Sequence, residues 1–356
     1  MSLSNIQSLK IEKCSKSRIS EVDFENLVFG TEFTDHMFEC DFKNGAWQEP
    51  TIKPYGPLSL DPSAKVFHYG QAVFEGMKAY KDVEGGVFLF RPDQNAKRIN
   101  TSSKRLAIPE FPETLFFEAL ESLLKLDKDW VPQKEGSALY IRPFVIATEH
   151  CVSAAPSNKY KFLIIMSPVN AYYAGKLKVK IAEKYSRAVD GGVGFAKAAG
   201  NYAAQFYPTN LAKEEGFQQV IWTDSQTHQY IEEAGTMNVF FRIKDTLITG
   251  PTSDRILDGV TRKSLIQLAE HRGISVEVRK ISVSEIVEAH ENGELLEIFG
   301  SGTAAVISQV TAFSYQGKTY ELPEPNMSFA ENLKQEMFNI QYNRSEDPFG
   351  WRYKVC

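Results

Sequence analysis

The chain has 356 residues, a formal net charge of -5, and a composition of 43% hydrophobic and 24% charged residues. A chain of this length exceeds what one small core usually holds, so we expect two domains. The acidic balance, without a dense cluster of lysine and arginine, argues against a nucleic-acid partner. The apolar run 162–166 is far shorter than the ~20 residues of a membrane span, so we expect no membrane insertion.

The cysteines and histidines show no pattern that is typical of a metal site. No C-x-x-C or H-E-x-x-H motif occurs, and we therefore expect no metal. The four cysteines lie far apart and fit a reducing cytoplasm, which is the expected location. The first twenty residues contain no continuous apolar segment, so a secretory signal is not expected, although a transit peptide stays open.

The first half of the chain combines strand and helix patterns. Short apolar runs at 65–69 and 86–90 alternate with turns and are typical of short strands. Helical spacing follows, and two longer apolar runs then predict buried strands. The helical segments are 95–106 and 115–126, and the buried strands are 138–146 and 162–166. We predict a mixed α/β domain over residues 1–169 and a linker of small residues over 170–180.

The second half, residues 181–356, is predicted to form its own larger domain. The predicted strands are 219–222, 239–242, 295–299 and 306–315. The predicted helices are 262–271, 283–291 and 329–341. The tail 346–356 is expected to lie on the surface.

The segment 191–202 places a single lysine, Lys197, among glycines and alanines and ends at Tyr202. A primary amine that captures a carbonyl needs a neutral form, and small neighbours let a flat cofactor approach its stem. Lys197 meets the steric requirement, although a surface lysine in a glycine-rich turn is an alternative. A P-loop ATPase is not favoured, because Ala198 stands where magnesium binding needs serine or threonine.

Two adjacent acids, Glu232 and Glu233, precede the small-residue segment 234–236. A pyridine nitrogen that must stay protonated needs a carboxylate beside it, because the charged ring is the electron sink of the reaction. Either glutamate could supply that carboxylate. Spacing alone does not choose between them.

Two glycine-containing turns are candidate anion sites. Residues 259–261 precede helical spacing, and the N–H groups at a helix start can bind a phosphate. Asp258 as an ordinary N-cap of that helix is the alternative. Residues 300–305 fit a loose dinucleotide-binding fingerprint, but a strand-like segment, 306–315, stands where that motif needs a helix. A nicotinamide enzyme is therefore not favoured.

These segments occur in an order that resembles the fold-type IV pyridoxal-phosphate enzymes. The match to branched-chain amino-acid aminotransferases extends from about Val28 to about Tyr353. The segments that carry it are 191–202, 230–238, 256–262 and 299–305. The resemblance implies an α+β two-domain fold of the D-amino-acid aminotransferase type. Its small α/β N-terminal domain and large C-terminal domain, with pseudo-barrel sheets surrounded by helices, hold pyridoxal 5'-phosphate in the cleft.

The resemblance also implies roles for individual residues. Lys197 is the implied catalytic residue, which anchors the cofactor and moves the alpha proton, and Glu233 is the acid beside the ring nitrogen. The implied cofactor-binding residues are Arg98, Lys197, Tyr202, Glu233, Thr236, Leu257, Gly259, Val260, Thr261 and Thr303. The implied substrate-binding residues are Phe29, Tyr69, Phe74, Tyr140, Arg142, Val152, Ala154, Tyr172, Thr236 and Ala304.

The implied reaction is a reversible ping-pong transfer of the amino group from L-leucine, L-isoleucine or L-valine to 2-oxoglutarate. An aromatic cage holds the apolar side chain, and Arg142 meets the distal carboxylate of glutamate or 2-oxoglutarate. The family picture is a homodimer, with Tyr69 and the loop of Val152 and Ala154 reaching the neighbouring subunit's pocket. Where some mammalian members carry a redox C-x-x-C, this chain has Ala305 and Ser308.

Three alternatives stay open at this point. Two belong to the same fold, a D-amino-acid aminotransferase and an aminodeoxychorismate lyase, which share a lysine, a glutamate and phosphate turns of this kind. The third is a protein that carries the cofactor without turning over a substrate. The presence of Lys197, Tyr202 and Glu233 together argues against this third reading.

Overall fold

The computed structural model describes residues 8–170, 177–304 and 306–356. The chain divides into two compact units, which are described separately. The first unit contains the described residues up to 170 together with 196–199 and 339–356, and the second contains the rest. Most of the predicted linker lies outside the described residues, and its end belongs to a strand. The domain boundaries at 169 and 181 stay a prediction.

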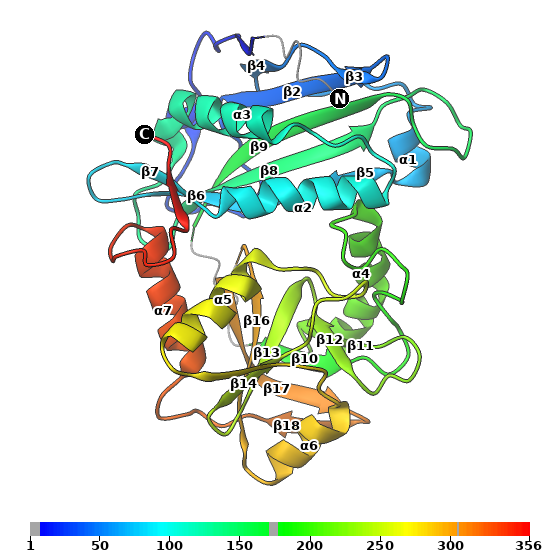
Figure 1. Ribbon diagram of the computed structural model, residues 1–356, viewed down its shortest axis with the longest axis vertical. Helices are drawn as coiled ribbons and strands as arrows, with labels where there is room; N and C mark the ends of the chain where they lie inside the picture. The colour runs from blue at the N-terminus through cyan, green and yellow to red at the C-terminus, as the bar shows by residue number, and fades with distance from the viewer. Residues whose placement is uncertain (1–7, 171–176, 305) are drawn as a thin grey trace. The chain divides into compact units, whose positions relative to one another are not determined.

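The first unit is built on a ten-stranded sheet in the order β1-β4-β2-β9-β8-β6-β7-β19, with β3 beside β2 and β5 beside β8 (Figure 1). All its pairs are antiparallel except β1 with β4. The strands are β1 (Lys10–Ile11), β2 (His36–Lys43), β3 (Ala46–Trp47), β4 (Thr51–Pro54), β5 (Ala72–Phe74), β6 (Met77–Lys81), β7 (Val87–Phe90), β8 (Ala138–Ala147), β9 (Tyr160–Val169) and β19 (Arg352–Lys354). The two predicted buried strands, 138–146 and 162–166, are confirmed as parts of β8 and β9.

Three α-helices of this unit are α1 (Lys65–Tyr69), α2 (Pro92–Arg105) and α3 (Glu113–Leu126). Short 3-10 helices occupy Ile19–Glu21 and Lys128–Trp130. Helix α2 begins with proline at its first position and an acid, Asp93, in its first turn, which is a favourable helix start. The apolar faces of α2 and α3 join the core of the sheet, and both predicted helices are confirmed.

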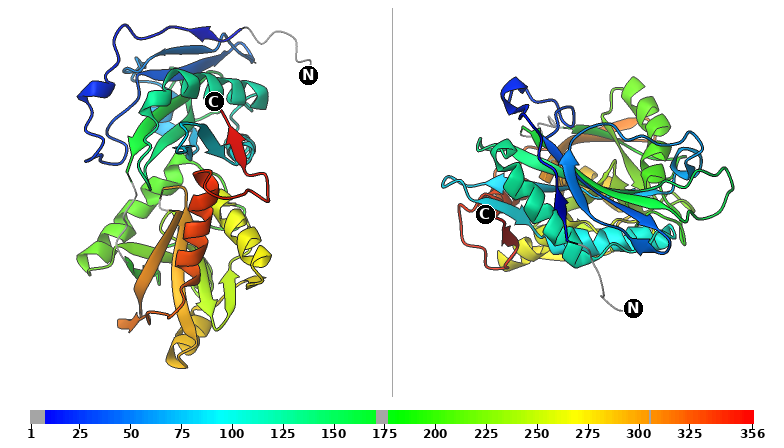
Figure 2. Two further views of the ribbon diagram at one scale, coloured as in Figure 1. Left: turned by 90° about the vertical axis from the view of Figure 1, so that its left-hand side faces the viewer. Right: turned by 90° about the horizontal axis from the view of Figure 1, so that it is seen from above.

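Two predictions for this unit are wrong. Residues 65–69 form helix α1 and not a strand, because Gly70 takes the left-handed conformation and ends a single turn that local bonds close. The tail 346–356 is not a surface segment throughout, because β19 pairs with β7 and both Trp351 and Val355 are buried. The C-terminal strand, drawn in red, lies beside the cyan β7 (Figure 2).

The second unit contains a nine-stranded sheet that closes on itself. The order β12-β11-β10-β17-β16-β13 forms a ring because β12 also pairs with β13, and β14, β15 and β18 extend it. The strands are β10 (Leu177–Ile181), β11 (Gln219–Thr223), β12 (Ile231–Ala234), β13 (Met237–Ile243), β14 (Thr246–Thr249), β15 (Ser275–Val278), β16 (Leu295–Gly302), β17 (Val306–Tyr315) and β18 (Lys318–Glu321). The predicted pseudo-barrel is confirmed, and alternate apolar residues fill its core.

Four helices belong wholly or mostly to this unit: α4 (Ala199–Glu214), α5 (Val260–His271), α6 (Val283–Glu291) and α7 (Phe329–Gln341). The predicted helices at 262–271, 283–291 and 329–341 are confirmed. Helix α6 starts at Ser282, whose hydroxyl oxygen accepts a hydrogen bond from the Glu285 N–H, an ordinary N-cap. Within the described ranges, no helix combines the length and the apolar character that crossing a membrane requires.

Candidate active site

Lys197 belongs to the first unit, where two elements hold its backbone. The Phe74 N–H donates to the Lys197 carbonyl at 3.0 Å, and Val73 forms a β-bridge with Ala198. The Lys197 N–H donates to the Ser102 hydroxyl of α2 at 2.9 Å. The lysine Nζ lies 4.4 Å from the centroid of the Phe74 ring. Strand β5 and helix α2 therefore fix the segment from which this amine projects.

Four of the predicted substrate residues form one cluster in the first unit. Tyr140 and Arg142 are two apart on β8 and so share a face of the sheet, and Arg142 Nη2 donates to the Tyr140 hydroxyl at 2.9 Å. The Arg142 Cζ lies 4.5 Å from the Phe74 ring centroid. Phe29 packs edge-on against Tyr140 with ring centroids 5.0 Å apart. The structure thus places three aromatic rings and one guanidinium together.

A buried acid beside this cluster, Glu75, was missed by the sequence analysis. Arg98 Nε and Nη2 donate to its two carboxylate oxygens at 2.7 and 2.9 Å, and Asn95 Nδ2 donates at 2.7 Å. Burial raises the pKa of Glu75, but the charges of Arg98 and Lys197 bring that pKa below its ordinary value. The sequence feature that could have indicated Glu75 is its position as a single acid between two short apolar strands. The role of Arg98 in phosphate binding stays a prediction.

The residues predicted to serve a neighbouring subunit form a separate group on the first unit. The Tyr69 hydroxyl donates to the Val152 carbonyl, and the two side chains are 44% and 65% exposed. Ala154 is also exposed. Tyr172, the remaining predicted cage residue, lies outside the described residues.

In the second unit, Glu233 is held from three directions. It stands opposite Asn238 in the β12–β13 pair, and its Oε1 accepts hydrogen bonds at 3.0 Å from Asn238 Nδ2 and from the Leu257 N–H. Its Oε2 forms an ion pair at 2.8 Å with Arg187 Nη2, and both side chains are 5% exposed. Arg187 and Asn238 were not predicted as site residues. The carboxylate is thus fixed in position and paired with a cation.

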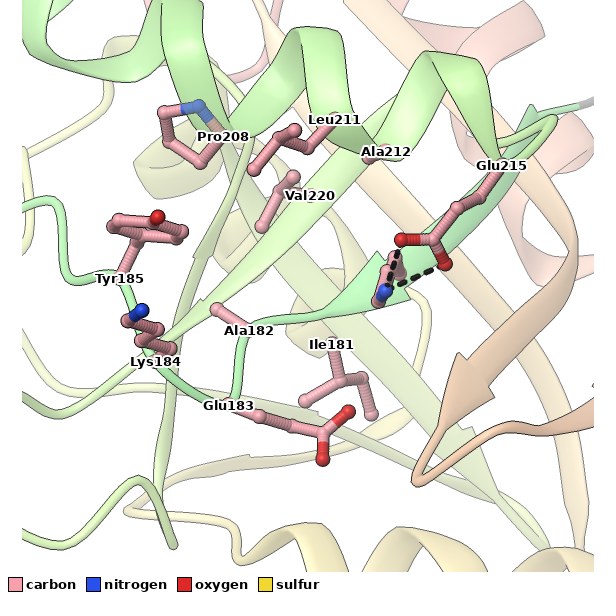
Figure 3. Close-up of a pocket in the computed structure, with 11 residues that line it drawn as sticks. Ile181, Ala182, Glu183, Lys184, Tyr185, Pro208, Leu211, Ala212, Glu215 and Val220 are labelled. Carbon is pink, nitrogen blue, oxygen red and sulfur yellow. Dashed lines mark hydrogen bonds and ion pairs between the residues drawn. The ribbon is translucent and has the colours of Figure 1, made fainter.

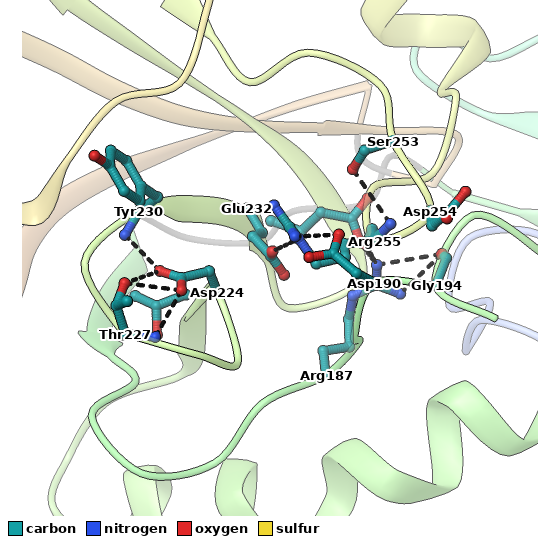
Figure 4. Close-up of polar contacts among 12 residues, drawn as sticks. Arg187, Asp190, Gly194, Asp224, Thr227, Tyr230, Glu232, Ser253, Asp254 and Arg255 are labelled. Atoms are coloured by element: carbon teal, nitrogen blue, oxygen red, sulfur yellow. Dashed lines mark hydrogen bonds and ion pairs between the residues drawn. The ribbon is translucent and has the colours of Figure 1, made fainter. Parts of the chain in front are cut away.

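The neighbouring Glu232 has a different environment. Successive residues of a strand point to opposite faces, and Glu232 pairs with Arg255, which also pairs with Asp190 (Figure 4). Burial raises the pKa of Glu232, and the charge of Arg255 partly opposes that effect. Glu233, and not Glu232, bonds to the Leu257 N–H beside the predicted phosphate turn. The geometry therefore favours Glu233 as the ring-facing acid.

The predicted phosphate turn is the start of helix α5. Gly259 is the N-cap, and among the described residues no side chain caps this helix. Asp258 is not the cap, as the alternative reading had it, because its carboxylate pairs with Lys263 Nζ at 2.9 Å. A Cβ on Gly259 would lie 1.9 Å from Asn238 Oδ1, so any larger residue would displace the Asn238 side chain. First-turn N–H groups without a capping side chain suit an anion.

The second predicted turn follows β16. Ser301 stands opposite Asn238 in the β13–β16 pair, and Thr303 comes two residues later. A Cβ on Gly300 would lie 2.6 Å from Met237 Cε, so the Met237 side chain packs directly over this glycine. The segment from Val306 onward is strand β17 and not a helix, as expected, which removes the structural basis for a dinucleotide fingerprint.

The other predicted cofactor residues lie on turns and helix starts of the second unit. Thr236 is exposed in the turn between β12 and β13. Tyr202 is half-buried in the first turn of α4, and Thr261 is buried in the first turn of α5. Ala304 is half-buried, and residue 305 lies outside the described residues.

A hollow of about 280 Å³ lies elsewhere in the second unit, between the C-terminal half of α4 and strands β10 and β11 (Figure 3). Its wall is formed by Ala182, Tyr185, Pro208, Leu211 and Val220, and Lys180 bonds to Glu215 at its edge. None of the predicted site residues lines it. We therefore assign it no part in the chemistry.

The donor groups fit a phosphorylated pyridine. A phosphate needs converging N–H groups, and α5 offers them behind a glycine that has no room for a side chain. A protonated ring nitrogen needs a buried carboxylate, and Glu233 is one. An aldehyde needs an amine, and Lys197 is held beside an aromatic ring.

This chain is similar to known proteins of one family. Residues 72–313 match the family model described as amino-transferase class IV. The branched-chain-amino-acid transaminase 1 of Bacillus subtilis is 46% identical over 339 residues, covering 94% of this chain and 95% of that protein. The branched-chain-amino-acid aminotransferase 2 of the same organism is 46% identical over 355 residues and 98% of each chain.

A solved structure shows the same fold. The branched-chain amino acid aminotransferase of Thermobaculum terrenum, in its PLP-form, aligns with a TM-score of 0.75 and 21% identity. The alignment covers 92% of this chain and 100% of that one. The predicted fold class is therefore confirmed. With a family model that covers residues 72–313 and relatives that match along nearly the whole length, this chain belongs to the class IV aminotransferases.

Proposed function

We propose that this chain transfers the amino group of L-leucine, L-isoleucine or L-valine to 2-oxoglutarate in a reversible ping-pong reaction. One observation carries the proposal: the Phe74 ring centroid lies 4.4 Å from Lys197 Nζ and 4.5 Å from Arg142 Cζ. An amine able to capture a carbonyl and a cation able to bind a carboxylate thus meet at one aromatic ring. A site that accepts an apolar side chain and then an acidic one needs this combination.

The cofactor is pyridoxal 5'-phosphate, which when bound supplies an electron sink for negative charge at the substrate's alpha carbon. Lys197 would hold it through Nζ, and the same atom would move the alpha proton of the substrate. Glu233 would accept a hydrogen bond from the ring nitrogen, and Tyr202 would donate one to the ring oxygen. The phosphate and its surroundings are assigned to Arg98, Thr236, Leu257, Gly259, Val260, Thr261 and Thr303.

The substrate side chain is assigned to the cluster of the first unit. Phe29, Phe74 and Tyr140 exclude water from a branched apolar group, and full burial of such a group is worth about 1.5–3 kcal/mol. Arg142 binds the distal carboxylate of glutamate or 2-oxoglutarate, which an apolar cage alone would reject. The Ala304 N–H is assigned to the alpha-carboxylate. Tyr172 is kept as a predicted member of the cage.

A homodimer is the assembly we infer. Phe67, Tyr69 and Val152 are 61%, 44% and 65% exposed, and their segments are joined by the Tyr69–Val152 bond. An exposed apolar group of this kind is typical of a protein interface. A second copy that covers it would receive Tyr69, Val152 and Ala154 at its own pocket. Light scattering should give twice the chain mass, and Val152→Glu should shift that mass towards the monomer.

A cytoplasmic location is also part of the proposal. Its support is four free thiols, one of them buried with its pKa raised to about 12 by that burial, which suit a reducing compartment. These cysteines are Cys14, Cys40, Cys151 and Cys356. Cell fractionation with an antibody against the chain checks this assignment.

The first test of the reaction is the visible absorption spectrum of the purified, cofactor-loaded protein. L-leucine should bleach the yellow band, and 2-oxoglutarate added afterwards should restore it, which reports both half-reactions. A yellow protein that responds only to D-alanine would indicate a D-amino-acid aminotransferase. A yellow protein that responds to neither amino acid would contradict transamination.

A further inference from the structure

Arg187 is a buried arginine whose guanidinium contacts three separate segments of the second unit. Its Nη2 forms the 2.8 Å ion pair with Glu233, and Nη1 and Nη2 donate to the Gly194 carbonyl at 3.3 and 3.2 Å. Nη2 also donates to the Arg255 carbonyl. Figure 4 shows Arg187 rising from its own loop towards Gly194 and Arg255. One cation therefore joins a strand and two loops.

The two loops that Arg187 joins are further bonded to each other. The Phe195 N–H donates to the Asp254 carbonyl at 3.0 Å, and the Gly191 N–H donates to the Asp254 carboxylate at 3.1 Å. A Cβ on Gly194 would lie 2.8 Å from the Arg255 Cα, so the loops approach as closely as glycine allows. Gly194 thus serves backbone packing between the two loops.

The loops that these contacts hold are close in sequence to Lys197 and to Leu257. In sequence, Gly194 precedes Lys197 by three residues, and Arg255 precedes Leu257 by two. The Leu257 N–H is itself a donor to Glu233 Oε1. The carboxylate is thus bonded on one oxygen by the loop that Arg187 holds, and on the other by Arg187 itself.

Burying a guanidinium is costly unless its charge and its N–H groups are satisfied, and apolar residues of similar size often stabilise a fold better. What a buried guanidinium provides in exchange is a fixed orientation for the carboxylate that it binds. A planar guanidinium holds a carboxylate in a defined orientation, whereas the compact ammonium of a lysine acts as a point charge. A buried carboxylate such as Glu233 is costly unless it is paired, and Arg187 supplies the opposite charge.

We propose that Arg187 is a positioning residue for the reaction, which holds the Glu233 carboxylate in the orientation that faces the ring nitrogen of the cofactor. The inference rests on the proposed function, because it takes Glu233 as the ring-facing acid. Arg187 itself touches neither substrate nor cofactor in this assignment. Its effect reaches the ring through Glu233 and through the loops of Gly194 and Leu257.

Arg255 is a matched control within the same network. It is a largely buried arginine of intermediate exposure, with a side chain that is 13% exposed, and it pairs with Glu232 and with Asp190. Replacing its side chain leaves its carbonyl, the acceptor of Arg187, in place. A purely structural loss of one buried ion pair should therefore affect the two arginine variants alike.

The experiment compares Arg187→Met, Arg187→Lys and Arg255→Met, each loaded with pyridoxal 5'-phosphate. The absorption maximum of the bound cofactor, its dissociation constant, the melting temperature without cofactor, and kcat and KM for L-leucine are measured. Arg187→Met should shift the absorption maximum and lower kcat about 100-fold with KM changed less than about threefold, since one oriented charge is lost. Arg187→Lys should have a kcat about tenfold higher than that of Arg187→Met, because lysine restores the positive charge but not the paired N–H donors of the guanidinium.

Three results would overturn the assignment: a wild-type spectrum and kcat in Arg187→Met, the same shift in Arg255→Met, or wild-type behaviour in Arg187→Lys should Arg187→Met fail to fold. Changes confined to melting temperature and equal in both arginine variants would mean that the pair is only structural. If wild-type protein binds the cofactor but L-leucine does not bleach it, the proposed function fails. The spectral comparison of the variants, which needs no substrate, then still decides the role of Arg187.

Discussion

The two units present their predicted site residues in different ways. In the first unit four of them are side chains from strands β5 and β8 and from one turn, and they contact one another through rings and a guanidinium: Phe29, Phe74, Tyr140 and Arg142. In the second unit the groups are backbone N–H donors and a carboxylate, held by glycines without room for a Cβ and by buried ion pairs. The first unit thus presents side chains of different chemical types, whereas the second presents backbone groups in fixed positions.

From this difference we infer which unit sets the choice of substrate and which unit binds the cofactor. A side-chain cluster can change its preference when one residue changes, because neighbouring rings can repack. A backbone cup cannot be tuned in this way, since its donors are common to all residues and depend on close approach. Substitutions in the first unit should therefore alter which substrate is used. Substitutions in the second should alter whether the cofactor is held and oriented at all.

The largest effect should come from Lys197, which contributes a reactive atom to the assignment. Lys197→Ala should lower kcat by about 10⁴-fold or more, because it removes both the cofactor anchor and the proton-transfer group. The second unit should still bind the cofactor, which separates the two roles. Turnover of L-leucine is the measurement, and the exposed Lys184→Ala serves as control. Robust activity in Lys197→Ala would sink the assignment, whereas retained cofactor binding alone would not.

The backbone cup of the second unit is tested by Gly259→Ala. The added Cβ would lie 1.9 Å from Asn238 Oδ1, so Asn238 must move and lose its bonds to Glu233 and to the Leu257 carbonyl. The cofactor dissociation constant should rise about 10- to 100-fold, which corresponds to about 1–3 kcal/mol. Gly56→Ala, where an added Cβ meets nothing within 4 Å, should change it little. An unchanged constant in Gly259→Ala would place the phosphate elsewhere.

Selectivity in the first unit is tested by Arg142→Met. The variant removes the cation above Phe74 and beside Tyr140 but keeps an apolar side chain of similar length. KM for 2-oxoglutarate should rise about tenfold or more, because a hydrogen bond to a charged group contributes about 1.5–3 kcal/mol. KM for L-leucine should change less than about threefold, because burial of its side chain is retained. An equal rise for both substrates would show that Arg142 supports the cluster and does not select between substrates.

Much of the fold was predictable because periodicity reports local packing. The helices at 115–126 and 329–341 were predicted with bounds close to those of α3 and α7, because their apolar faces repeat every three to four residues. The strands β8 and β9 were predicted from apolar runs. The failures, α1 and β19, are short elements. Their structure depends on Gly70 and on pairing with β7, which periodicity does not report.

The sequence names candidate site residues where the residue type itself indicates the chemistry, and it does not name residues whose importance comes from their contacts in the fold. Lys197 and Glu233 were named from motifs, but Glu75, Arg187 and Asn238 were not. Their importance arises from distant segments that meet: Arg187 and Glu233 are separated by 45 intervening residues of sequence. A buried charge has no local signature, since most arginines and glutamates lie on the surface.

The smallest effect concerns the turn that joins β11 to β12 and so leads to Glu233. Asp224 holds this turn, because its carboxylate accepts hydrogen bonds from the N–H groups of Thr227, Gln229 and Tyr230 at 2.8–2.9 Å. Burial raises the pKa of Asp224, but these bonds lower it to about 2. Asp224→Asn should therefore reduce the free energy of unfolding at pH 7 by about 2 kcal/mol.

The pH dependence of that difference has a defined sign. The pKa of Asp224 is lower in the folded chain, about 2, than the roughly 3.9 of an unfolded aspartate, so its stabilisation is complete only above the unfolded value. Denaturant unfolding should show the gap between wild type and Asp224→Asn narrowing below about pH 4 and closing near pH 2. Asp245→Asn, at a side chain that is 95% exposed, should stay within about 0.5 kcal/mol of wild type at pH 7. A gap that stays constant with pH would mean that Asp224 stabilises the turn through its shape and not its charge. The turn that leads to Glu233 would then depend on its hydrogen-bond geometry alone.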